Sequence, residues 1–384
     1  MASSAFGKAL GVVQKKVTNV VKPVESNLLC KKLQLDSPRL SFVYGGGIKI
    51  GCFHRLTGPE SGGKSTISTY IAGQFQKHLA EQFPELADHR IIVYLDFERS
   101  FDPEHAKEIG LDTTSVINDD GSFNKDGVFC LLQPDCLEDA ATALEELIKS
   151  NEVSLVIFDS ESMAPTRTVM EDEFNKANFG SGAKALKEFC NRFNILCANY
   201  NTTMIVISQE RAQMAMMSHA IQTTGGYALK YVASTLNRVR KIENLTEGSK
   251  ITGIHMQVRN MKNKTSIPFR ECEMDLYFKD GFDSNCEYVD FLKEFSEDPR
   301  LMPLCIAGNG GTFKSEKFGW SYRGKDNFIA AIKNNEVIGW EEIKQTVQNI
   351  ISHEIEGMEN TADPEQEKEQ NLTQEEAERL DNKE

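Results

Sequence analysis

Residues 58–65, with the sequence GPESGGKS, match the phosphate-binding loop pattern GxxxxGK[ST]. This loop requires a β-strand before it and an α-helix after it. The preceding CFHRLT reads as a strand, and a helix is expected to begin near Gly63. Glycines let backbone N–H groups approach phosphate oxygens at a helix N-terminus, where the helix dipole also favours anions. A chance match is expected in only roughly one or two chains of this length per hundred.

Two side chains of the loop carry most of the expected chemistry. Lys64 would reach the β- and γ-phosphates of a nucleoside triphosphate, and the Ser65 hydroxyl would bind Mg²⁺. The residues expected to hold the nucleotide here are Gly58, Pro59, Glu60, Ser61, Gly62, Gly63, Lys64, Ser65 and Thr66.

The rest of the chain alternates apolar strands with amphipathic helices. Strands are predicted at 91–97, 154–160 and 203–209, and helices at 64–83, 103–109, 137–150 and 180–200. Continuous apolar strands of this kind predict a mainly parallel sheet covered by helices on both faces. Shorter alternating strands follow at 234–243, 252–261 and 269–278. A small C-terminal α/β lobe, with helices near 325–335 and 340–352, completes the predicted α/β fold.

Composition narrows the class of protein. Lys or Arg interrupts every apolar run, so neither a membrane span nor a signal-peptide core is expected. The nine cysteines are odd in number and lack metal-binding spacing, which is typical of reduced thiols in the cytoplasm. Residues 353–384 hold twelve acidic and three basic residues, so they carry −9 of the net charge of −14. This aromatic-free tail is expected to be disordered.

Polar residues at strand ends identify the rest of the expected site. Asp159 ends an apolar strand and is expected to hold the Mg²⁺ shell. Glu98 follows the strand at 91–97 and could polarise a water molecule for attack on the γ-phosphate. Asp96 is a rival, because strand alternation turns both carboxylates to the same face. Gln209 ends a third strand, where its amide could sense the γ-phosphate.

Two segments are predicted to be loops. Residues 169–180 are polar and lack strand or helix periodicity. Residues 210–224 contain three methionines and lead into Gly225 and Gly226. A buried methionine-rich helix is the alternative for this second segment, but it has no clean apolar face. A flexible loop connected to Gln209 therefore fits it better.

Several motifs in a consistent order resemble the RecA recombinases. They are GPESGGKS, LDFERSFDPEHAKEIGLD, VIFDS, TTGGYALKYVAS and KNKTSIPF. The resemblance spans nearly the whole chain, and the unusual loops point to a divergent, phage-encoded member. It implies a RecA-type P-loop ATPase core that uses ATP and Mg²⁺.

The resemblance also implies roles for individual residues of the nucleotide site. Glu98 matches the catalytic glutamate, in preference to Asp96, and Gln209 matches the γ-phosphate switch. Asp102 matches a residue that contacts adenine, and His105 stands where the family stacks an aromatic ring on the base. Two residues, Lys262 and Lys264, match lysines that reach the γ-phosphate across a subunit interface.

The two predicted loops match the family's DNA-binding loops. Arg211 and the TTGG turn are expected to hold DNA phosphates, and Met214 matches an apolar side chain inserted between base triplets. The second loop has Ser218 where the family has a phenylalanine that couples neighbouring subunits. The DNA-binding residues implied are Phe179, Lys184, Arg211, Met214, Thr223, Thr224, Gly225 and Gly226.

The resemblance divides the chain into four parts. Residues 1–35 would supply a helix and strand that contact the next protomer, and residues 36–281 would form the ATPase core. Residues 282–352 form the C-terminal lobe and 353–384 the acidic tail. Basic residues of the lobe resemble the family's surface for duplex DNA, a surface that the tail could occupy by charge. These residues are Lys314, Lys317, Arg323 and Lys325, near Trp320 and Tyr322.

The function implied is a DNA-dependent ATPase that forms filaments on single-stranded DNA and catalyses homologous pairing and strand exchange. Its partners would be single-stranded DNA, homologous duplex DNA, further copies of the chain, and single-strand-binding and loader proteins. One alternative is a hexameric helicase with the same ATPase fold, which should carry a larger N-terminal domain. The other is an ATP-switched DNA-binding mediator that hydrolyses poorly.

Overall fold

The computed structural model describes residues 31–171, 181–212, 221–223, 226–308 and 311–353. The predicted N-terminal helix, residues 172–180 of the first predicted loop, residues 213–220 and 224 of the second, and residues 354–384 of the acidic tail lie outside these ranges. Within the described ranges, every helix is too short or too polar to cross a lipid bilayer.

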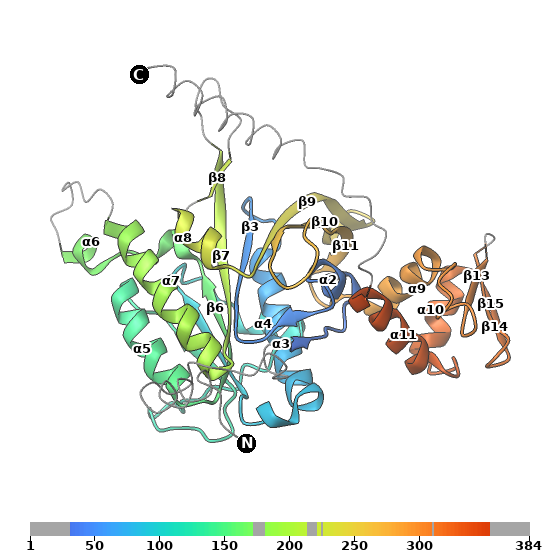
Figure 1. The fold of residues 1–384 in the computed structure, drawn as a ribbon, viewed down its shortest axis with the longest axis horizontal. Coiled ribbons are helices and arrows are strands. Elements are labelled where there is room, and N and C mark those ends of the chain that lie inside the picture. Colours follow the sequence, from blue (N-terminus) through green and yellow to red (C-terminus); the bar gives the residue numbers. More distant parts are fainter. Residues whose placement is uncertain (1–30, 172–180, 213–220, 224–225, 309–310, 354–384) are drawn as a thin grey trace, which may run out of the picture. The chain divides into compact units, whose positions relative to one another are not determined.

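The apolar runs form the centre of one ten-stranded sheet (Figure 1). Its parallel part consists, in spatial order, of β9 (Thr235–Glu247), β3 (Phe53–Gly58), β7 (Thr203–Ala212), β6 (Val153–Asp159), β4 (Ile91–Asp96) and β5 (Phe129–Leu132). The sheet continues beyond β9 with the antiparallel strands β10 (Lys250–Asn263), β11 (Glu271–Tyr277) and β12 (Gly281–Phe282).

Strand register brings the predicted site residues to one edge of this sheet. Gly58, at the end of β3, lies opposite Gln209 of β7. Asp96, at the end of β4, lies opposite Asp159 of β6. Because parallel strands end at the same edge, residues far apart in the sequence meet there, and this is where open α/β sheets bind ligands.

Helices cover both faces of the sheet, as predicted. In β6, Leu155 and Ile157 pack into one apolar core, whereas the alternate residues Val156 and Phe158 pack into the other. The first core includes residues of α3 (Lys64–Gln82) and α4 (Pro103–Glu108). The second includes residues of α5 (Leu137–Lys149), α7 (Ser181–Tyr200) and α8 (Gly226–Val232). The α/β fold with a mainly parallel sheet is confirmed.

The C-terminal lobe is confirmed as a small α/β unit. It contains α9 (Ser284–Glu294), β13 (Ile306–Gly308), β14 (Thr312–Ser315), β15 (Trp320–Arg323), α10 (Lys325–Lys333) and α11 (Trp340–His353). Its buried residues belong to the same apolar cluster as α3. Gln348 also donates hydrogen bonds to the Leu35 carbonyl and the Tyr288 hydroxyl, at 3.3 and 2.6 Å. The four-part division of the chain stays a prediction.

Several short elements were missed by the sequence analysis. They are α2 (Pro38–Val43), β2 (Ile48–Lys49), β5, α6 (Arg167–Glu171), β8 (Ile221–Thr223) and α9, whereas β1 (Lys32–Leu33) lies within 1–35, where a strand is expected. Most are too short to show periodicity. Two of them correct the predicted loops: α6 includes the first residues of 169–180, and β7 and β8 pair antiparallel at the two ends of 210–224.

Candidate nucleotide-binding and catalytic site

The loop between β3 and α3 has the backbone geometry of a phosphate-binding loop. Gly58 has φ of 151°, and a Cβ atom there would lie 2.1 Å from the Val239 carbonyl oxygen. Gly63 has φ of 90° and is followed directly by α3. A side chain at Gly58 would clash with backbone, and the left-handed φ of Gly63 strains any other residue, so glycine is favoured at both positions. The N-terminus of α3 therefore faces the loop, as anion binding requires.

A cavity of about 360 Å³ lies beside this loop and gathers most of the predicted nucleotide residues. It is lined by Glu60, Ser61, Gly62, Gly63, Lys64, Ser65, Thr66, Glu98, Asp159, Ile207 and Gln209. Of the predicted loop residues, only Gly58 and Pro59 are outside this lining. Sequence reasoning missed Ile207, which is an unremarked apolar residue within β7.

Lys64 is nearly buried and lies against its own loop. Its ammonium donates hydrogen bonds to the carbonyl oxygens of Gly58 and Pro59, at 3.0 and 2.6 Å. Burial lowers the pKa of Lys64, while the carboxylates of Asp159 and Glu98 oppose that shift. A cation at this position is well suited to exchange carbonyl oxygens for phosphate oxygens.

Oxygen ligands suitable for Mg²⁺ lie at the start of α3. The Ser65 hydroxyl donates to Asp159 Oδ2 at 2.7 Å, and Tyr94, which sequence reasoning missed, donates to the same oxygen at 2.7 Å. Burial raises the pKa of Asp159. No cluster of three or more His, Cys, Asp or Glu ligands occurs among the described residues. The site therefore fits Mg²⁺ held by few protein ligands together with phosphate and water, not a metal site made wholly of protein.

The structure distinguishes Glu98 from Asp96. Glu98 Oε1 accepts hydrogen bonds from the Ser160 hydroxyl at 2.5 Å and from Gln209 Nε2 at 2.9 Å. Asp96 is buried and accepts from two backbone N–H groups of the following turn. Strand β4 ends at Asp96, so the alternation expected to align the two carboxylates does not reach Glu98. Of the two carboxylates, Glu98 alone lines the cavity.

The two residues predicted to contact adenine lie at the start of α4, where Asp102 is the N-cap and His105 belongs to the first turn. The Asp102 carboxylate caps this helix by accepting from the backbone N–H groups of Glu104 and His105, at 2.9 and 3.2 Å. This bonding alone explains an aspartate at the N-cap of the helix. Neither Asp102 nor His105 lines the 360 Å³ cavity, and their contact with a base stays a prediction.

Lys262 and Lys264 lie near the end of β10, outside the cavity lining of their own chain. The Lys264 ammonium donates to the Tyr231 carbonyl at 2.7 Å, and that of Lys262 donates to the Lys230 and Tyr231 carbonyls. Burial and the neighbouring Lys264 ammonium lower the pKa of Lys262 to about 8. Two cations held this close favour an anion from outside the chain.

This crowding predicts a pH dependence. The pKa of Lys262 is about 8 in the folded chain, below its ordinary value of 10.5. The cost of holding its charge is therefore present below pH 8 and is relieved as the pH rises toward 10.5. If a γ-phosphate binds the charged form, nucleotide-dependent assembly should weaken between about pH 7 and about pH 9. Light scattering across that range measures it.

Arginine at position 262 keeps its charge at every pH in this range. Lys262→Arg should therefore assemble with a much flatter pH profile than the wild type, whereas Lys264→Arg serves as the matched control. Equal pH profiles for all three proteins would exclude titration of Lys262 as the cause.

Three of the four described DNA-binding candidates flank the predicted second loop, and the fourth, Lys184, follows the first. Arg211 lies on β7 with its backbone paired to Gln222 of β8, and Thr223 pairs with Glu210 (Figure 1). Gly226 begins α8, and Lys184 is exposed on α7. The other four candidates lie outside the described residues: Phe179, Met214, Thr224 and Gly225.

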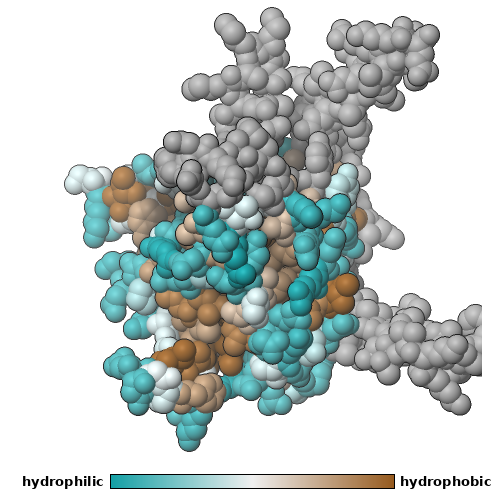
Figure 2. All heavy atoms as spheres, turned by 90° about the vertical axis from the view of Figure 1, so that its left-hand side faces the viewer, coloured by the Kyte–Doolittle hydropathy of each residue, from teal (hydrophilic) through white to brown (hydrophobic). Residues whose placement is uncertain are grey.

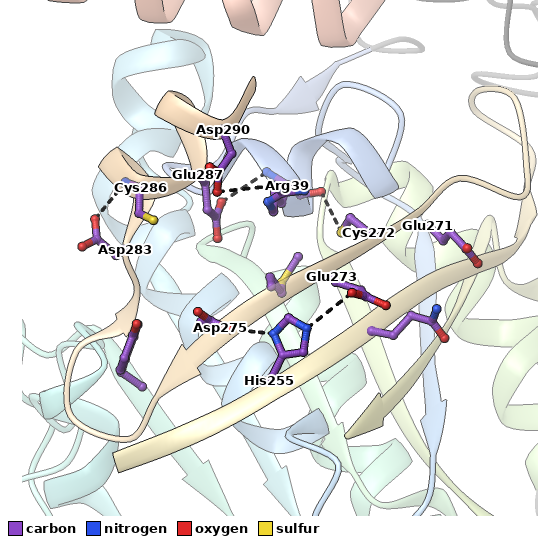
Figure 3. Close-up of a pocket in the computed structure, with 13 residues that line it drawn as sticks. Arg39, His255, Glu271, Cys272, Glu273, Asp275, Asp283, Cys286, Glu287 and Asp290 are labelled. Atoms are coloured by element: carbon purple, nitrogen blue, oxygen red, sulfur yellow. Dashed lines mark hydrogen bonds and ion pairs between the residues drawn. The ribbon is translucent and has the colours of Figure 1, made fainter. Parts of the chain in front are cut away.

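A second, larger cavity of about 480 Å³ lies between β10, β11 and α9 (Figure 3). Its lining is rich in carboxylates, which would repel a nucleotide. Most of these carboxylates already have a cationic partner: the pairs are Arg259–Glu271, His255–Asp275, Lys333–Asp283 and Lys325–Asp290. Burial raises the pKa of Glu287 to about 7, which further reduces the negative charge. Most of the carboxylates therefore already have partners within the chain, and we assign no ligand there.

Known proteins match this chain over most of its length. The family model "RecA N-terminal domain" matches residues 31–283. Protein RecA of Mycoplasma mycoides is 31% identical over 307 residues, which cover 80% of this chain and 79% of that protein. Protein RecA of Campylobacter lari is 28% identical over 308 residues, with 80% of each chain covered.

A solved structure, the crystal structure of the RadB recombinase, aligns with a TM-score of 0.44 at 17% identity, covering 64% of this chain and 97% of that one. The family assignment rests on the sequence matches, since the family model spans more than half of the chain. The relatives are matched over about four fifths of their own length. The chain belongs to the RecA family.

Proposed function

We propose that this protein is a DNA-dependent ATPase that forms filaments on single-stranded DNA and catalyses homologous pairing and strand exchange. The observation that carries the proposal is the hydrogen bond from Gln209 to Glu98, at 2.9 Å. It joins a carboxylate beside the phosphate-binding loop to the strand that runs into the predicted DNA-binding loop. A contact of this kind can link nucleotide state to DNA binding.

The chemistry follows from the groups in the cavity. Glu98 orients and polarises the attacking water, and Lys64 neutralises charge on the transferred phosphoryl group. Bound Mg²⁺ would be held through Ser65 and Asp159 and would supply further neutralisation of phosphate charge. Expected cofactors are therefore ATP and Mg²⁺.

The same cavity supports a switch. A γ-phosphate beside Gln209 offers its amide an acceptor that competes with Glu98. Exchange of one acceptor for the other moves the end of β7, and the loop after it then changes its affinity for DNA. Hydrolysis reverses the exchange and releases the DNA.

Two features of the surface support the proposed assembly into filaments. Lys262 and Lys264 do not line the nucleotide cavity of their own chain, and their ammonium groups donate to carbonyls of α8, so we infer that the γ-phosphate they bind belongs to a neighbour. The side chains of Ile117, Phe123 and Leu131 are 56, 66 and 42% exposed around β5, which ends the described sheet. Figure 2 shows apolar surface gathered between polar side chains on one face of the molecule. Such surface is typical of protein interfaces.

The remaining partners and the setting are extensions of this proposal. Single-strand-binding and loader proteins would assist assembly, and homologous duplex DNA would be the second substrate. The protein would act in the cytoplasm of a bacterium or a phage-infected host. A hexameric helicase and a poorly hydrolysing mediator remain the rival functions.

One experiment separates the three functions. ATP hydrolysis is measured with and without single-stranded DNA, and the products are viewed by electron microscopy. We expect DNA-stimulated hydrolysis and helical filaments. Rings would favour the helicase, filaments with negligible hydrolysis would favour the mediator, and hydrolysis indifferent to DNA would refute the recombinase proposal.

A further inference from the structure

A buried ion pair joins segments that lead into the catalytic cavity. Arg55 of β3 donates through Nε to the Ser208 hydroxyl at 2.8 Å and through its terminal nitrogen to Glu161 Oε1 at 3.4 Å. The side chains of Arg55 and Glu161 are each 1% exposed. Ser208 is fully buried. We call these three residues the buried triad.

Stability alone does not explain the buried triad. Removing an arginine and a glutamate from water costs several kcal/mol for each ion, which their attraction only partly returns. Apolar residues of similar volume are often equally stable in such a place. An ion pair, however, holds two elements in one relative geometry, because its hydrogen bonds are directional.

The elements that the triad joins carry the two partners of Glu98. Ser208 immediately precedes Gln209 within β7, which runs on to Ala212, and Glu161 immediately follows Ser160 after β6. Both Gln209 and Ser160 donate to Glu98 Oε1. Arg55 itself lies three residues before Gly58, so the phosphate-binding loop is anchored to the same point.

We propose that the buried triad is a positioning device that fixes the Gln209–Glu98 contact and thereby sets how strongly DNA stimulates hydrolysis. This inference rests on the proposed function and adds residues that touch neither nucleotide nor DNA. With the triad intact, the ends of β6 and β7 move as one unit, so a displacement of Gln209 by the γ-phosphate is passed to the loop after β7. Without the triad, the ends of β6 and β7 relax independently, and the displacement of Gln209 does not reach the loop after β7.

The test uses a double variant, Arg55→Met with Glu161→Leu. Replacing both partners leaves no unpaired buried charge, so the melting temperature should stay near that of the wild type. The nucleotide Kd should change by no more than about twofold. The ratio of DNA-stimulated to unstimulated kcat should fall about tenfold, as expected when catalytic groups are misplaced without loss of binding.

The matched control is Thr202→Val. Thr202 is fully buried, and its hydroxyl donates to the Val153 carbonyl at 2.8 Å. It therefore joins the same two strands, β6 and β7, at their opposite ends. This variant should lose some stability but keep the wild-type stimulation ratio. If the triad has only a structural role, the control and the double variant should show the same stimulation ratio.

The outcomes are distinct. If DNA stimulates hydrolysis equally in the wild type and the double variant, the role of the triad is overturned and the proposed function stands. If DNA does not stimulate hydrolysis by the wild type, both the role of the triad and the proposed function are overturned. If the double variant does not fold, Ser208→Ala removes the Arg55 acceptor beside Gln209. It should lower the stimulation ratio about threefold, and an unchanged ratio there overturns the inference.

Discussion

Replacing Lys64 by alanine is expected to lower kcat for ATP hydrolysis by at least about a hundredfold and to abolish ATP-dependent strand exchange. The reason is the position of its ammonium, which lies among the carbonyl oxygens of the phosphate-binding loop and lines the cavity. No other lysine or arginine lines that cavity among the described residues. Phosphate release and a strand-exchange assay measure the two effects.

Lys77→Ala is the matched control, because Lys77 lies on the same helix, is 61% exposed and pairs with Asp36 at the surface. An exposed pair of this kind contributes about 0–1 kcal/mol to stability, so this variant should behave like the wild type. Normal strand exchange by the Lys64 variant would refute the assignment of the nucleotide site.

Much of the site could be predicted because its signals are local. The phosphate-binding loop needs glycines at fixed positions, and those positions are visible in eight consecutive residues. Asp159 and Gln209 follow long apolar strands, so the rule that parallel strands end at one edge was enough to bring them together. The structure adds the register, in which Gly58 lies opposite Gln209.

Other parts could not be predicted because they depend on contacts between distant residues. The Tyr94 hydroxyl reaches Asp159 across 65 positions, and Arg55 reaches Glu161 across 106. Neither pair has a sequence pattern. The end of β4 at Asp96 likewise depends on the turn that Asp96 itself stabilises. Very short strands such as β5 could not be predicted for a simpler reason, because four residues show too little alternation of apolar and polar side chains.

The site and the fold are therefore coupled through the strand ends. Polar contacts hold the strands that supply catalytic candidates. Tyr94 bonds to Asp159 of β6, the buried triad joins β7 to the segment after β6, and Asp96 of β4 accepts from the turn that follows it. This arrangement predicts that the neighbouring carboxylates Glu98 and Asp96 respond differently to amide substitution. The Glu98 variant should lose mainly hydrolysis, and the Asp96 variant mainly folding stability.

Glu98→Gln is expected to lower kcat by about a hundredfold to a thousandfold while the nucleotide Kd stays within about threefold. The amide keeps the shape of the side chain and can still accept from Ser160, but it cannot polarise the attacking water as a carboxylate does. Filaments formed with ATP should therefore persist, because nucleotide binding is kept and hydrolysis is lost. Single-turnover hydrolysis, nucleotide titration and electron microscopy over time measure these effects.

Asp96→Asn is the contrasting control. Asp96 is buried, and its carboxylate accepts from the backbone of Ser100 and Phe101 and from Gln133 Nε2. Losing these charge-assisted bonds should cost about 1–3 kcal/mol of folding stability and lower the melting temperature, with a smaller effect on kcat than Glu98→Gln. If Asp96→Asn instead stopped hydrolysis at an unchanged melting temperature, and Glu98→Gln remained active, Asp96 would be the catalytic carboxylate.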